Sequence, residues 1–447
     1  MAGISSFTGL NTALRGVQAQ QAALDVTSHN ISNIETPGYS RQRAVFGAAP
    51  SLAIPAGAKQ DGTGAQLGQG VDVVAYQRMR DDFLDLQFRA QSMTSGQADV
   101  TAQRLGVVQD QLGSGNPNDM GKLLDKYWSA WQTLAANPQS TDAKSAVVGA
   151  SQAVAQRFNE MDKDFAAVGT QATTAVSDML GPQGPIKPIA DELAKLNGQI
   201  NNAYGSGQAP NDLLDRRDLL LDQLSNYGQV SVTADPTLDA AGNPAYPGMV
   251  QVSFGGAATP LVSQATVTMP TTATLSATPG GQIGGLQDVA AKTAGYRTTL
   301  ANLAAAVIST TNSTSSAPVF SGTGAADIAV VATSATISAG ASGGAAGDNS
   351  VALALAAQRG GAVDKGYSGL VGTIGSDVQQ AENSSTTAAS VLDSLTSRRS
   401  SVAGVSMDEE MTNMIRFQRG YQAAARALTT MDDLLNQLIN STGRVGL

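Results

Sequence analysis

The sequence contains no cysteine and a single histidine, His29. Without thiols it cannot form disulfides, Cys-bound zinc sites or iron–sulfur clusters, and it has no thiolate nucleophile. One imidazole also excludes sites that need two histidines, such as a metalloprotease helix. His29 has only Asp25 on the preceding turn and no positioned nucleophile, so we interpret it as a structural or interface histidine. We therefore expect a protein that is not an enzyme and that holds no cofactor or metal.

Charged and aromatic residues are also few, at 14% and 4% of the 447 residues. A hydrophobic fraction of 42% still supplies a core, and the length fits about three domains. The net charge of −9 has the wrong sign for binding nucleic acid or an anionic membrane. No run of about 18 apolar residues occurs, and no basic segment precedes an apolar one at the N-terminus, so we expect neither a membrane span nor a cleaved signal peptide.

Apolar residues recur with heptad spacing over the first thirty residues. The two rows of the repeat are Phe7, Leu14, Gln21 and Ser28, and Leu10, Val17, Leu24 and Ile31. This spacing predicts one amphipathic helix of about 28 residues, which needs another helix alongside it. The helix should end at residues 36–39, because Pro37 fits the second position of a turn and Gly38 accepts the positive φ that follows.

The C-terminal segment shows the same pattern over about four heptads. Its a and d positions are Met411, Met414, Gln418, Tyr421, Ala425, Leu428, Asp432, Leu435 and Ile439. Ser406 and Glu409 form a capping box, so we interpret the acids at 408–410 as a helix cap rather than a catalytic pair. Two interpretations stay open for the terminal helices: a coiled coil sealed within one protomer, or a pair that stays incompletely buried until other copies surround it.

Between the ends, the sequence predicts helices and a β-rich insertion. Helical patterns cover residues 81–112, 120–136, 141–180, 191–227, 285–311, 350–359 and 366–401. Alternating Val, Thr and Ser residues predict short strands over 229–279 and a smaller patch over 321–338. Because the helices on both sides of the insertion must pack together to bury their stripes, the termini should meet and the molecule should be elongated.

The expected fold is therefore mainly α with a β-rich insertion, an α+β multidomain protein with paired terminal helices. Residues 1–60 and 405–447 should form a terminal coiled-coil domain with its adjoining turn. Residues 61–228 and 285–404 should form a helical-bundle body with minor β elements, and residues 229–284 a small β-rich outer domain.

Short matches to catalytic motifs do not hold up. Residues 340–344 fit the G-x-S-x-G pattern, but His29 lies upstream of them, whereas a hydrolase of that kind needs a later histidine. Gly121 and Lys122 lack the Ser or Thr that a phosphate loop requires. Neither hydrolysis nor nucleotide binding is indicated.

A local basic cluster stands out in this acidic chain. It consists of Arg41, Arg43, Arg78 and Arg80, with Asp72, Asp81 and Asp82 nearby. The first interpretation is a solvated face or pairing with these aspartates. The alternative is contact with an acidic patch on a neighbouring subunit.

Residues 28–42, from Ser28-His29-Asn30 to Tyr39-Ser40-Arg41-Gln42, resemble the N-terminal signature of flagellar rod, hook and hook-associated proteins. The segments that agree with it are Gly70 to Val73 followed by Arg78, Asp81, Phe83, Leu84 and Gln87, then 211–218 and 418–426. These ordered matches are most similar to members at the hook–filament junction. Gly420 stands where the family usually has alanine, the chain is short for the family, and the central β region has no residue-by-residue match.

The resemblance implies a structural subunit that is exported unfolded through the flagellar type III apparatus and works outside the cell. It implies a ring of copies that contacts hook protein below and the second junction protein above, after a cytoplasmic export chaperone has held the C-terminal helix. The alternatives are another axial subunit (hook, rod or second junction protein) and a secreted carbohydrate-active or adhesive protein.

The expected assembly interface combines both terminal helices with the signature between them. Its N-terminal members are Phe7, Leu10, Leu14, Val17, Leu24, Asn30, Ile31, Asn33, Gly38, Tyr39 and Arg41, and its C-terminal members are Met411, Met414, Ile415, Tyr421, Leu428, Leu435 and Ile439. Terminal helices with an exposed apolar stripe are what a tubular assembly buries and what a chaperone shields.

Overall fold

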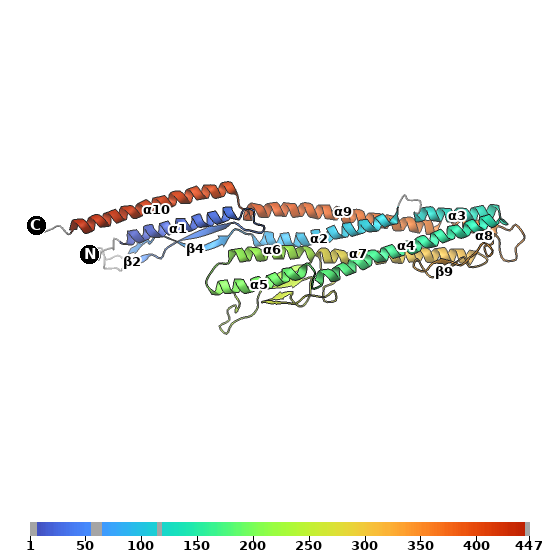
Figure 1. Ribbon diagram of the computed structural model, residues 1–447, viewed down its shortest axis with the longest axis horizontal. Coiled ribbons are helices and arrows are strands. Elements are labelled where there is room, and N and C mark those ends of the chain that lie inside the picture. Colours follow the sequence, from blue (N-terminus) through green and yellow to red (C-terminus); the bar gives the residue numbers. More distant parts are fainter. Residues whose placement is uncertain (1–6, 55–64, 114–118, 443–447) are drawn as a thin grey trace.

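The computed structural model describes residues 7–54, 65–113 and 119–442. In these ranges the molecule is elongated and mainly helical, with both termini at one end (Figure 1). The expected fold class, mainly α with small β portions, is confirmed. Among the described residues, no helix combines the length and the apolar character that a membrane span requires.

The elements follow one another in a simple order along the chain (Figure 1). The helices are α1 (Phe7–Ser32), α2 (Asp82–Leu112), α3 (Met120–Ala136), α4 (Thr141–Leu180), α5 (Ile186–Gly205), α6 (Asn211–Tyr227), α7 (Gly281–Thr314), α8 (Ser350–Ala356), α9 (Ala362–Ala403) and α10 (Met407–Thr442). The strands are β1 (Gln42–Ala48), β2 (Leu52–Ile54), β3 (Ala65–Leu67), β4 (Val71–Arg78), β5 (Val230–Ala234), β6 (Val250–Phe254), β7 (Val262–Ser263), β8 (Thr266–Val267), β9 (Phe320–Ser321) and β10 (Ala329–Val330).

One expected helix was wrong, because residues 191–227 form two helices. α5 starts earlier, at Ile186, and ends at Gly205, where Gly207 takes a positive φ of 73°. Pro188 fits inside the first turn of α5, where a missing N–H leaves no intrahelical bond unmade. Pro210 then precedes α6.

At the terminal end, α1 packs between α10 and a two-stranded ribbon, and we call this group the terminal unit. β1 and β4 of the ribbon pair antiparallel, from Gln42 opposite Arg78 to Ala48 opposite Val71. The register shifts between Val45 and Phe46, which breaks the alternation of the side chains. The sequence patterns did not predict this ribbon.

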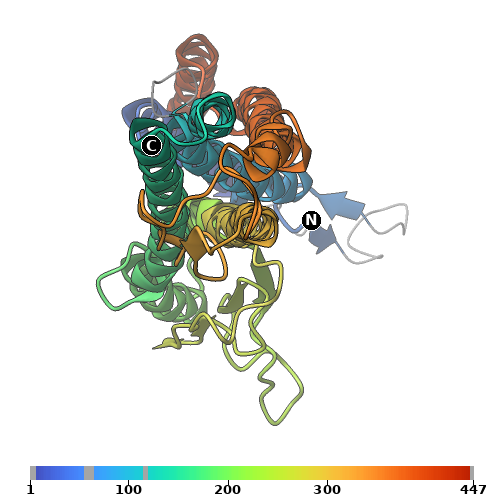
Figure 2. The same cartoon turned by 90° about the vertical axis from the view of Figure 1, so that its right-hand side faces the viewer.

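The remaining helices form the body, in which α2, α4, α7 and α9 run along its length (Figures 1 and 2). Its core is one contiguous cluster that runs the length of the body. The largest fully buried side chains include Tyr127, Trp128, Trp131, Phe158 and Phe165. Tyr127 and Thr311 share a buried hydrogen bond of 2.8 Å between their hydroxyl groups.

The β-rich insertion lies beside α5 on the flank of the body (Figure 2). Its sheet has the order β5-β6-β7-β8, and the Asn197 amide of α5 donates to the carbonyls of Val250 and Gln264. Val252 and Phe254 of this sheet belong to the main hydrophobic cluster, so the insertion packs directly on the helical core. The three-domain division expected from the sequence stays a prediction.

Candidate assembly interface and joint

Small residues line the face of α1 that meets α10. A Cβ atom added to Gly16 would lie 3.5 Å from the Ala424 Cβ, and one added to Gly9 would lie 3.0 Å from the Met431 Cε. Asn30, two heptads after Gly16, contacts Glu410. The contact row therefore lies two positions after the row of Leu14, and small residues let the two helices approach closely.

The large apolar residues of the expected interface lie on other faces. Leu14 is 42% exposed and Ile415 is 51% exposed, and Met411 and Tyr421 are exposed as well. The half-buried members are Leu10, Val17, Leu24, Ile31, Met414, Leu428 and Leu435. The side chains of Phe7 and Ile439 lie outside the described residues. The helices thus pair within one chain, and Leu14, Met411, Ile415 and Tyr421 remain exposed. We call this set of exposed apolar side chains the outer face.

Asn30 is a buried hub at the end of α1. Its amide nitrogen donates to the Gln42 carbonyl at 2.9 Å and to Glu410 Oε2 at 3.1 Å. Its carbonyl oxygen accepts from the Tyr39 hydroxyl at 2.7 Å and from the Gln42 N–H at 3.0 Å. One side chain therefore ties α1, the following turn, β1 and α10 together. Burial, with Asp212, Asp215 and Glu410 nearby, raises the pKa of Tyr39 and keeps it a hydrogen-bond donor.

The other signature residues shape the turn after α1. Asn33 donates from its amide to the His29 carbonyl and accepts from the Thr36 hydroxyl, both locally. Gly38 has a φ of 80°, which confirms the positive value expected from the sequence. A Cβ atom there would lie 2.9 Å from the Leu219 Cβ. Glycine at 38 therefore allows both the turn and the close approach of the turn to α6.

Arg41 fastens the start of α10 to the ribbon. Its guanidinium pairs with Glu409 at 2.6 Å and with Glu410 at 2.7 Å. Its N–H donates to the Ala403 carbonyl at the end of α9, and its carbonyl accepts from the Met79 N–H. Arg41 thus holds together the points where α9 ends and α10 begins.

A network of four arginines and four aspartates joins the terminal unit to the body, and we call this region the joint. The ion pairs join Arg78 to Asp215 and Asp218, Arg80 to Asp85, Asp215 and Asp218, Arg89 to Asp218 and Asp222, and Arg399 to Asp85 and Asp222. Asp215, Asp218 and Asp222 follow one face of α6 at helical spacing. They receive arginines from β4, the segment after it, α2 and α9.

The local pairing proposed for the basic cluster was therefore wrong. Arg41 and Arg78 bind acids far away in the sequence, and Arg43 bonds Gln77. Arg80 binds Asp85, five residues on, as well as the distant Asp215 and Asp218. Asp72 pairs with Arg15 of α1, and Asp81 caps α2 by accepting from the Phe83 N–H. Sequence proximity gave the wrong partners because the fold brings α6 onto Arg78 and Arg80, and α10 onto Arg41.

Charge balance within the joint sets the ionised state of Asp218. Burial raises the pKa of Asp218, but the charges of Arg80, Arg78 and Arg89 lower it by more than burial raises it. The pKa of Asp218 therefore lies below its usual range. A buried charge of this kind is stable only while its partners stay in place.

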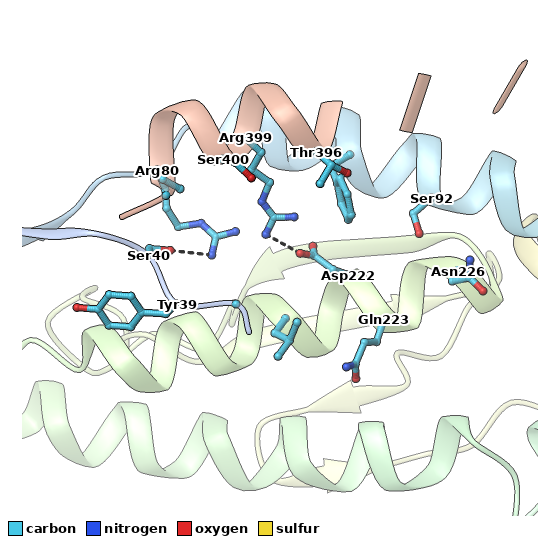
Figure 3. Close-up of a pocket in the computed structure, with 15 residues that line it drawn as sticks. Tyr39, Ser40, Arg80, Ser92, Asp222, Gln223, Asn226, Thr396, Arg399 and Ser400 are labelled. Atoms are coloured by element: carbon cyan, nitrogen blue, oxygen red, sulfur yellow. Dashed lines mark hydrogen bonds and ion pairs between the residues drawn. The ribbon is translucent and has the colours of Figure 1, made fainter. Parts of the chain in front are cut away.

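A cavity of about 450 Å³ lies against the joint (Figure 3). Tyr39, Ser40, Phe88 and Leu219 contribute to its wall, together with the end of α9. Figure 3 shows Arg399 bonded to Asp222 and Arg80 bonded to Ser40. The charged groups of this cavity are thus engaged with one another. In the part of the chain that the structure describes, His, Asp and Glu side chains form no group able to hold a metal ion.

Family comparisons first define the class of protein. The model "Flagella basal body rod protein" matches residues 10–39, and "Flagellar basal body rod FlgEFG protein C-terminal" matches residues 397–441. These two ranges cover most of α1 and α10, the paired helices of the terminal unit. The model "Flagellar hook-associated protein FlgK helical domain" matches residues 105–326 of the body. The chain is a structural axial component of the bacterial flagellum.

Individual relatives narrow the class. Flagellar hook-associated protein 1 of Bacillus subtilis is 30% identical over 510 aligned positions, which cover 98% of this chain and 99% of that protein. The protein of the same name from Salmonella typhimurium is 31% identical over 227 positions, which cover 50% of this chain and 39% of that protein. The chain belongs to the flagellar hook-associated protein 1 family, which confirms the resemblance seen in residues 28–42.

A solved structure is also similar. It is the flagellar hook junction protein FlgK from Burkholderia pseudomallei, with 21% identity and a TM-score of 0.41. The match covers 52% of this chain and 43% of that one.

Proposed function

We propose that the chain forms the junction between the flagellar hook and filament, as a ring of copies packed through the terminal units. The outer face carries this proposal, since Leu14, Met411, Ile415 and Tyr421 are exposed in the single chain. Full burial of one such side chain is worth about 1.5–3 kcal/mol, so contacts between copies stabilise the assembly. The match to the Bacillus subtilis protein over nearly its whole length supports the same function.

The proposal includes the partners and the location. Hook protein lies below the ring and the second junction protein above it, outside the cell, after export through the flagellar apparatus. A cytoplasmic chaperone covers α10 before export. The exposed apolar residues of α10, such as Met411 and Leu434, support this step because they need cover in a soluble subunit.

The function proposed is packing without catalysis. The charged groups around the cavity at the joint (Figure 3) form ion pairs with one another rather than facing an open cleft. The proposed units are those expected from the sequence. Residues 1–60 and 405–447 make the assembly contacts, while the body and the outer domain space the copies and form their exposed part.

Deletion of the gene tests the proposed function. Cells without the protein should carry hooks without filaments and release flagellin into the medium, and the wild-type gene should restore filaments. The variant Leu14→Asp should not restore them, because it places a charge on the outer face. The matched control is Leu353→Asp on α8, an exposed leucine at the far end of the body, which should restore filaments. Normal filaments in the deletion strain would contradict the proposal.

A further inference from the structure

The start of α2 exposes two large apolar side chains that the fold does not use. Phe83 is 66% exposed and Leu86 is 63% exposed. Residues three apart lie side by side on a helix surface, so the two form one apolar spot. Their neighbours Asp85 and Phe88 turn inward instead, where both contact Arg399. Phe83 is one of the residues that resemble the flagellar family, yet the joint needs neither side chain.

An unpaired acid lies beside this spot. Asp82, the first residue of α2, is exposed and has no ion pair among the residues that the structure describes. The capping bond of α2 comes from Asp81, so Asp82 is free of that task.

The complementary surface lies on α10. Between Met411 and Met431 this helix carries three arginines and no acid, in a chain whose net charge is −9. Within the described ranges Arg419 is exposed and has no ion pair, whereas the four arginines of the joint are all paired. Met411, Ile415 and Arg419 follow one another at intervals of four, which places them on one face of the helix.

We propose that the Asp82, Phe83 and Leu86 spot of one copy packs against the Met411, Ile415 and Arg419 stripe of the next copy. This inference rests on the proposed function, because it needs copies arranged side by side. The partner is identified by matched chemistry: an apolar centre with an acid on one side meets an apolar centre with a base.

The order of the residues also fits. α2 leads away from the joint along the body, and α10 leads away from the joint toward the chain termini (Figure 1). The two helices therefore run in opposite directions, so Asp82 meets Arg419 when Phe83 and Leu86 meet Ile415 and Met411. The two surfaces differ, so the contact is head-to-tail and builds a ring or helix rather than a closed dimer. The surfaces start on different sides of the joint, so neighbouring copies are staggered along the long axis.

Charge reversal with rescue gives the first test. In the deletion strain, Asp82→Arg and Arg419→Asp should each lower the number of filaments about tenfold, because each places like charges in contact. The double variant should restore most of the filaments. The matched control is Asp110→Arg, which changes an exposed aspartate in the same helix and should have no effect. Single variants with normal filament numbers, or a double variant without rescue, would overturn the pairing.

Disulfide trapping gives the second test and uses the absence of cysteine from the natural chain. Cells that make Phe83→Cys and Ile415→Cys as separate chains should give a cross-linked dimer after oxidation of their isolated flagella. Each variant alone, and Leu353→Cys together with Ile415→Cys, should give none.

Flagella that contain both variants but give no dimer would overturn the contact, while the Leu14→Asp result would still stand for the proposed function. Should the cysteine variants fail to build flagella, the charge-reversal rescue decides the matter.

Discussion

The buried amide of Asn30 uses all of its hydrogen-bonding groups, and it bonds to the turn, β1 and α10. Replacing it by alanine removes one hydrogen-bond partner each from Glu410 and the Tyr39 hydroxyl, and it leaves the Gln42 backbone without its side-chain partner. We expect Asn30→Ala to lower the free energy of unfolding by about 2–3 kcal/mol, measured by urea denaturation. The control is Asn33→Ala, which loses only local bonds. Equal stability of the two variants would show that the hub is not what holds these segments together.

Asp218 makes stability depend on pH. Its pKa in the folded protein lies below the usual value, because Arg80, Arg78 and Arg89 outweigh the effect of burial. The stability that ionised Asp218 contributes is therefore fully present above the pKa of about 3.9 that an aspartate has in the unfolded chain. This stability is lost as the pH falls toward the lower pKa of the folded protein. We expect the unfolding free energy to drop below about pH 4, as followed by denaturation at several pH values.

The matched variants for that titration are Asp218→Asn and Asp110→Asn. Asp218→Asn should be less stable near neutral pH and should lose part of the acid dependence. Asp110 is exposed and outside the joint, so its variant should follow the wild-type curve. Parallel curves for wild type and Asp218→Asn would contradict the assigned role.

Single residues were predictable where the cause is local. Gly38 was expected to take a positive φ because a turn after Pro37 requires it, and the structure confirms this value. Arg78 was assigned to nearby aspartates, but it binds Asp215 and Asp218 on α6. Only the tertiary fold sets these partners. The spacing of the acids on α6 was the available signal, and it indicated one charged face without showing what meets it.

At the scale of elements, the packing of α1 on α10 depends on small residues. A Cβ atom at Gly16 would make an ordinary contact of 3.5 Å with Ala424, so Gly16→Ala should be tolerated. Gly16→Leu should push α10 away and raise the amide hydrogen exchange of residues 407–437 roughly tenfold. Unchanged exchange in the leucine variant would contradict close packing at this row.

Gly420 shows the same effect from the other helix. A Cβ atom there would lie 2.7 Å from Gln20 Oε1. The glycine makes room for this side chain at a cost of about 1 kcal/mol in helix propensity relative to alanine. An alanine at this position would therefore require the Gln20 side chain to move.

The heptad pattern predicted both terminal helices but not the row that joins them. Large apolar residues dominate such a pattern, whereas the row of α1 that meets α10 contains Gly9, Gly16 and Asn30, which carry almost no hydrophobic signal. The large apolar residues of the pattern that stay exposed are available for contacts with neighbouring copies instead. The ribbon of β1 and β4 was missed because a bulge interrupts its alternation, and the α5–α6 break because the helical pattern continues on both sides of it.

At the scale of the whole molecule, an isolated chain should be least protected at its ends. The outer face is exposed in one copy, while the body has a continuous core. Limited proteolysis of the monomer should therefore trim α1 and α10 first and leave a resistant body, as followed by mass spectrometry. Cleavage at equal rates along the chain would argue for a terminal unit that is complete in itself.

The elongated shape was predictable because helical patterns on both sides of the insertion must pack against one another. The sequence could not show that the sheet of the insertion shares the main core, since Phe254 and Val252 meet helices that are distant in the chain. Nor could it place the joint, which needs four segments to converge.

The joint has a mechanical consequence. Once the terminal unit is fixed, the body becomes a cantilever, and a sideways force on its free tip produces the greatest bending moment at the four arginines and four aspartates. Several of these arginines touch two or three carboxylates, so a small slip exchanges one partner for another without opening a void. We therefore expect the attachment to be elastic, so that it yields under torque and returns to its original geometry when the load is released.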